Sequence, residues 1–140
     1  MKGKFGDSQR IAHILEAIEE IESYTQDIDF NIFFEKSIIK YASIKQLEII
    51  GEASNHLSND FRAKTSHIKW PEIIGLRNFL VHEYFGVDEK IIWQIITVDI
   101  PELKENLKSI SLKNILCQIC QISCICERHR HKDTKAQRKE

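Results

Sequence analysis

The sequence has few residues that interrupt helices, with only two prolines and five glycines among 140 residues. This scarcity leaves room for long helices, because both residues are unfavourable in helix interiors. The sequence also lacks an alternating strand pattern and an internal repeat. It contains no apolar run of the roughly 20 residues that cross a membrane, and no secretory signal at its start. We therefore expect an all-α protein of the cytoplasm that has no membrane contact.

Cysteine is confined to one short stretch, which contains Cys117, Cys120, Cys124 and Cys126. A disulfide framework would spread its cysteines along the chain, so we do not expect a stapled fold. Together with His129 and His131, these cysteines allow a zinc site, but their spacing departs from paired C-x2-C knuckles. The alternative is a helix extension with small apolar cysteines, and we expect no metal.

The sequence also lacks a strong net charge, which is −1. Residues 128–140 nevertheless contain six basic and two acidic residues, whereas the rest of the chain is mildly acidic. A basic tail can hold a phosphate backbone loosely, and the alternative is a solvated end without specific function. The length favours one domain. We place it at residues 1–112, followed by a cysteine-rich and then basic tail at 113–140.

Apolar residues at spacings of three and four predict that most of the chain is helical. We expect helices over about 8–24, 29–57, 60–65, 70–85 and 88–98, and a final segment from 99. Asp7 or Ser8 would cap the first helix, and Gly86 fits the left-handed residue that ends many helices. Two points stay open: a bend before Ser37, and whether Pro101 kinks the last unit or opens a separate helix. The pattern predicts an up-and-down bundle of four main helices with short additional helices.

The segment of residues 73–86 has polar side chains that can carry chemistry. On a helical wheel, one side of this segment carries only apolar residues. The opposite arc contains Arg77, Asn78, His82 and Tyr84, together with the apolar residues Ile74, Val81 and Phe85. A helix that is apolar on both sides is usually covered on both sides. The second cover is either another helix of this chain or a partner subunit, and a symmetric dimer would pair two such arcs in one groove.

These residue types suit metal-free cleavage of RNA, in which the ribose 2′-hydroxyl attacks its own phosphate. Histidine transfers protons near neutral pH, and arginine stabilises charge that develops on a phosphate. Asparagine can orient the imidazole or the substrate. The alternative for Arg77 and His82 is structural, as an ion-pair partner and a hydrogen-bonded core histidine.

The octapeptide from Arg77 to Tyr84 resembles the R-x4-H-x-Y signature of HepT-like ribonuclease toxins, a branch of the HEPN superfamily. Further likeness runs over about residues 8–112. It includes Leu47–Asn55, Ile68–Gly75 (in which the usual order of proline and tryptophan is reversed), Phe85–Asp88 and the segment from Ile92 to Leu103.

The resemblance implies a dimerising helical bundle that is a metal-independent endoribonuclease without a cofactor and cleaves tRNA or mRNA. It assigns Arg77 and His82 as the catalytic pair and Asn78 as a supporting residue. It also implies that a minimal nucleotidyltransferase, the antitoxin of a type VII toxin–antitoxin pair, transfers AMP to Tyr84. Toxin and antitoxin together would then form a higher hetero-oligomer. Glu52 is either a site residue or a packing-supporting acid of its helix.

Two other functions compete with this interpretation. The chain could be a non-catalytic helical partner of a nucleotidyltransferase, although a scaffold alone has no need of the Arg77, His82 and Tyr84 set. It could also be a metal-binding interaction protein that acts through its cysteine-rich tail.

Overall fold

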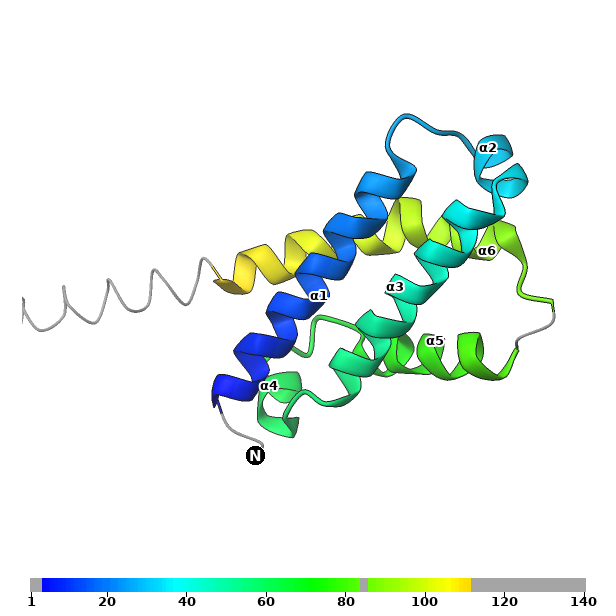
Figure 1. The fold of residues 1–140 in the computed structure, drawn as a ribbon. Helices are drawn as coiled ribbons and strands as arrows, with labels where there is room; N and C mark the ends of the chain where they lie inside the picture. The colour runs from blue at the N-terminus through cyan, green and yellow to red at the C-terminus, as the bar shows by residue number, and fades with distance from the viewer. Residues whose placement is uncertain (1–3, 84–85, 112–140) are drawn as a thin grey trace, which may run out of the picture. The chain divides into compact units, whose positions relative to one another are not determined.

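The computed structural model describes residues 4–83 and 86–111, and these residues contain helices but no strand (Figure 1). The all-α expectation is therefore confirmed. The helices are α1 (Lys4–Thr25), α2 (Phe30–Glu35), α3 (Ser37–Asn55), α4 (Asn59–Lys64), α5 (Trp70–His82) and α6 (Glu89–Gln94), followed by the π-helix η1 (Ile95–Asp99). Residues 100–111 are helical again. The chain divides after Asn106, and the site discussed below lies within the first unit.

The core of this unit is built around α3, which packs against α1 on one side and α5 on the other (Figure 1). Its buried side chains come from nearly every helix because each presents one apolar stripe inward. They include Ile14, Ile18, Ile21, Phe33, Leu47, Ile50, Trp70, Leu80, Ile92, Ile96, Ile100 and Leu103. Within the described part of the chain, no helix is long and apolar enough to cross a membrane.

The first helix begins earlier than expected, at Lys4, so neither Asp7 nor Ser8 caps it. The carboxylate of Asp7 has a different role. It accepts hydrogen bonds from the backbone N–H and the hydroxyl of Ser58. Ser58 in turn caps α4, where its hydroxyl accepts from the N–H of Phe61. Asp7 is suited to cap its own helix, but it instead connects the start of α1 to the start of α4.

The bend left open before Ser37 is present and divides the second helical segment into α2 and α3. Lys36 adopts an extended conformation with φ −92° and ψ 91° between the two helices. Asp29 caps α2 by accepting from the N–H of Ile32 at 2.9 Å. Because α2 is short, it depends on packing against its neighbours, among them α6.

The helix that carries the signature begins where the sequence predicts. Trp70 and Pro71 form its first turn, in which a proline loses no hydrogen bond. The buried indole N–H of Trp70 donates to the hydroxyl of Thr65 at 2.9 Å, and this hydroxyl donates to the carbonyl of Phe61 at 2.7 Å. These bonds fix the start of α5 against α4.

The last helical unit shows how Pro101 affects the hydrogen bonding of the turn before it. Asp88 caps α6, as expected, by accepting from the N–H of Lys90. The unit then passes through η1, where the N–H of Ile100 bonds to the carbonyl of Ile95, five residues back. Pro101 has no N–H and cannot make the next α-helical bond, so a π-helical turn lies directly before it. Because the helical unit continues through Pro101, the proline does not open a separate helix.

Two ion pairs join helices that are distant in sequence. Lys40 of α3 contacts Glu89 at the start of α6 at 3.0 Å, and Lys104 contacts Glu22 of α1 at 2.5 Å. A backbone hydrogen bond in the first turn of α6, helped by Lys40, lowers the pKa of Glu89. The hydrogen bond to Glu22 raises the pKa of Lys104. Both shifts favour the charged forms, so the two contacts are ion pairs near neutral pH.

Candidate active site

The outward face of α5 presents most of the predicted site residues. Trp70 and Leu80 are buried on its inner side. On the opposite arc, the Arg77 side chain is 36% exposed, and Asn78, Val81 and His82 are all exposed. The sequence pattern predicts a cover for this arc, and none of the described helices supplies one over Val81, which is 44% exposed.

Arg77 lies where α5 comes closest to α3. A Cβ atom placed on Gly51 of α3 would lie 2.3 Å from the Arg77 Cβ and 3.2 Å from the carbonyl oxygen of Ile73. Both distances are shorter than a normal contact, so only glycine allows the helices to approach this closely. The crossing fixes the backbone of Arg77 relative to the next residue on α3, Glu52.

Four polar side chains connect across this crossing. The Glu52 Oε2 lies 3.0 Å from the Arg77 Nε, and the Glu52 Oε1 lies 2.9 Å from the His56 Nε2. The Arg77 Nη1 donates to the Asn78 Oδ1 at 2.9 Å. The sequence had left the role of Glu52 open between site residue and packing support. The structure places its carboxylate against the predicted catalytic arginine.

Sequence reasoning missed His56 and the role of Gly51. A signal for Gly51 was present, because a lone glycine inside a helical pattern often marks close approach of another backbone. Asn78 was predicted to be a supporting residue that can orient the imidazole or the substrate. Its Oδ1 accepts a hydrogen bond from the Arg77 Nη1.

His82 is the last residue of α5, and its side chain is exposed. It lies five positions after Arg77, which corresponds to about 7.5 Å along a helix axis. The expected end of the helix at 84–85 is wrong, because α5 ends at His82 and Glu83 already leaves helical geometry with ψ 44°. The wheel position that put Tyr84 beside Arg77 assumed a continuing helix and does not hold. Tyr84 and Phe85 lie outside the described residues.

Gly86 has φ +103°, the left-handed conformation predicted for it. It does not end α5, however, because it lies four positions after the last residue of the helix. Its role is to turn the loop that leads to α6.

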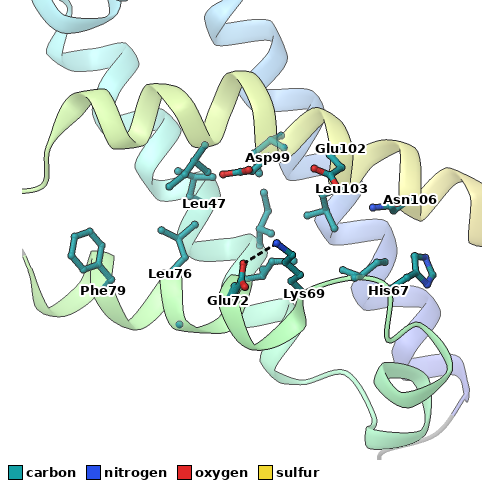
Figure 2. A pocket seen from close by; sticks show the side chains of 16 residues that line it. Leu47, His67, Lys69, Glu72, Leu76, Phe79, Asp99, Glu102, Leu103 and Asn106 are labelled. Carbon is teal, nitrogen blue, oxygen red and sulfur yellow. Dashed lines mark ion pairs between the residues drawn. The ribbon is translucent and has the colours of Figure 1, made fainter.

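A cavity of about 420 Å³ lies on the other side of α5, between this helix, α3 and η1 (Figure 2). Leucine and isoleucine side chains form much of its lining, and Asp99 and Glu102 lie near its rim. Of the predicted site residues that the structure describes, none lines it. The cavity and the polar face of α5 are therefore separate features of the same helix.

Among the described residues, no group of three histidine, cysteine or acidic side chains lies close enough to hold a metal ion. The cysteine-rich stretch lies outside those residues. The described site contains an arginine whose backbone position is fixed by the helix crossing. It also contains an exposed imidazole on the same helix and polar side chains that contact the guanidinium. Such groups can bind a phosphate and move a proton beside it.

Comparison with known proteins shows the family to which the chain belongs. The family model described as ribonuclease HepT-like matches residues 14–110. The chain is 45% identical to "Putative RNase MJ1380" of Methanocaldococcus jannaschii over 68% of this chain and 87% of that relative. It is also 45% identical to "Probable ribonuclease HepT" of Thermococcus cleftensis, over 65% of this chain and 83% of that relative. A third relative, "Putative RNase TTE0752" of Caldanaerobacter subterraneus, is 42% identical over 74% and 92% of the two chains.

No solved structure matches the chain. The family model covers more than half of the sequence and includes Gly51, Arg77 and His82. The names of the relatives support a nuclease. The chain belongs to the ribonuclease HepT-like family.

Proposed function

We propose that this chain is the toxic component of a type VII toxin–antitoxin system and acts in the cytoplasm as a metal-independent endoribonuclease. One observation carries the proposal: a family signature in which Arg77 forms an ion pair with Glu52 while His82 is exposed on the same helix, α5. The substrate is single-stranded RNA within a tRNA or an mRNA, because the reaction needs a ribose 2′-hydroxyl beside a flexible phosphate.

His82 takes the proton of the 2′-hydroxyl, and the 2′-oxygen then attacks the adjacent phosphorus. The bond from phosphorus to the 5′-oxygen breaks, and this oxygen receives a proton from an imidazolium. The products are a 2′,3′-cyclic phosphate and a 5′-hydroxyl. Arg77 stabilises the negative charge that builds up on the phosphate oxygens during the attack.

The proposal includes a symmetric homodimer in which two copies of α5 share one cleft. Support comes from Val81, which is apolar and 44% exposed between residues 77 and 82. A partner that covers Val81 would bring its own His82 and Arg77 to the same groove. The second His82 would then be available as the proton donor for the leaving 5′-oxygen.

The direct test is cleavage of a purified tRNA and mRNA by the full chain in the presence of excess EDTA. We expect products with 2′,3′-cyclic phosphate ends and a rate loss of about 10²- to 10⁴-fold in His82→Ala. His13→Ala is a matched control, because His13 is an exposed histidine of α1. Cleavage by His82→Ala at the parental rate would refute the proposed chemistry.

We further propose that a cognate minimal nucleotidyltransferase silences the site by transferring AMP to Tyr84. Each AMP would add bulk and negative charge two residues after His82, close to where a phosphate must bind. Intact mass after coexpression with the nucleotidyltransferase should show steps of one AMP unit that are absent from Tyr84→Phe. Steps that persist in Tyr84→Phe would move the modification to another residue.

A further inference from the structure

Glu52 has an unusual place among the carboxylates of this fold. It follows Gly51, the residue that allows α3 and α5 to touch, so its carboxylate lies directly at the crossing. The Oε2 atom is buried and lies 3.0 Å from the Arg77 Nε, and it accepts no hydrogen bond from the described residues. Glu48 lies one turn earlier on the same helix and forms an ion pair with Lys45 at 3.6 Å. The two glutamates therefore lie on the same helix but form ion pairs with different residues.

The way Glu52 contacts Arg77 matters for the phosphate. A guanidinium has five N–H donors in a fixed plane. The Nε forms an ion pair with the Glu52 Oε2 at 3.0 Å, without a hydrogen bond between them, and Nη1 donates to the Asn78 Oδ1 at 2.9 Å. Among the described residues Nη2 has no hydrogen-bond partner, so its edge remains available for an anionic oxygen. One ion pair and one hydrogen bond thus restrain the group without occupying the whole of it.

His56 holds the other end of the same carboxylate. Its Nε2 lies 2.9 Å from the Glu52 Oε1. An ionised carboxylate only accepts hydrogen bonds, so the imidazole donates from Nε2. This contact restrains the second oxygen of the Glu52 carboxylate and limits the rotamers open to the side chain.

We infer that Glu52 is a positioning residue for Arg77, and that His56 steadies Glu52 in this role. The inference rests on the proposed ribonuclease function. Glu52 does not touch the substrate. It sets the plane and the direction of the guanidinium, so that the Nη2 edge meets the phosphate as charge develops on it.

The test compares Glu52→Gln with Glu48→Gln in the full chain, because both substitutions remove one negative charge from the same face of α3. We expect Glu52→Gln to lower kcat on RNA about 10- to 100-fold. Its KM should stay unchanged or fall, because a negative charge near an anionic substrate has been removed. Glu48→Gln should retain the parental kcat. His56→Ala should reduce kcat in the same direction by less than about tenfold.

A second readout requires no RNA. The Arg77 Nε–H signal in a ¹H–¹⁵N spectrum should shift and exchange faster with water in Glu52→Gln, and should be unchanged in Glu48→Gln. If the parent cleaves no RNA, the proposed function fails, and this signal alone then decides whether Glu52 holds Arg77.

Three results would overturn the inference. They are an Arg77 signal that Glu52→Gln leaves unchanged, an equal loss of kcat in Glu48→Gln, and a shifted signal with parental kcat. A merely structural role for Glu52 would instead lower the urea midpoint of unfolding and raise KM together with the loss of kcat.

Discussion

Gly51 and Gly75 are both glycines in the interior of a helix, but only Gly51 lies against a neighbouring helix. A Cβ atom at Gly51 would lie 2.3 Å from the Arg77 Cβ, whereas one at Gly75 would have no atom within 4 Å. The Arg77 Cβ is attached to the α5 backbone and cannot rotate away. The Gly51→Ala substitution must therefore separate the two helices, whereas Gly75→Ala need not move anything.

We predict opposite effects of these two substitutions on the free energy of unfolding. Gly75→Ala should stabilise by up to about 1 kcal/mol, because alanine is the better helix former. Gly51→Ala should destabilise by about 1–2 kcal/mol, because overpacking at the crossing outweighs the same gain. Urea unfolding monitored by circular dichroism measures both values. Equal stabilisation by the two substitutions would show that the crossing tolerates a Cβ and that Gly51 does not set the place of Arg77.

At the scale of the helix, α5 shows which features can be predicted from sequence patterns and which cannot. Its start was predictable because Trp70 and Pro71 act locally, and proline fixes its own φ and lacks an N–H. The face that carries Arg77, Asn78 and His82 was predictable because helical periodicity is local as well. The end was not, because the signal came from Gly86, whose positive φ serves the loop rather than the helix terminus.

The contacts of the site depend on a second helix, and sequence patterns within one helix do not predict them. Asn78 and His82 are one turn apart and can touch, and only the structure shows that the Asn78 oxygen accepts from Arg77. The orientation of Arg77 is in turn set by Glu52, which is 25 positions away in the chain and reaches it only through the α3–α5 crossing. Family resemblance could identify the arginine and the histidine, but it gave no account of what holds the arginine in place.

At the scale of the whole molecule, the exposed apolar side chains indicate where a partner would bind. Two exposed valines make a matched pair: Val81 on α5 is 44% exposed, and Val98 in η1 is 55% exposed. Only Val81 lies between Arg77 and His82 on the signature helix. A dimer that shares one cleft must cover Val81, whereas nothing in the proposed arrangement places Val98 in the interface.

We therefore predict that Val81→Asp weakens the dimer and Val98→Asp does not. A carboxylate left without a partner in the interface costs about 3 kcal/mol, which raises the dissociation constant of the dimer more than about 100-fold. Sedimentation velocity over a range of concentrations measures this constant, and RNA cleavage should fall in parallel because each cleft needs both copies of α5. Two outcomes would contradict the shared cleft: a Val81→Asp chain that remains as dimeric as the parent, or a monomeric one that cleaves RNA at the parental rate.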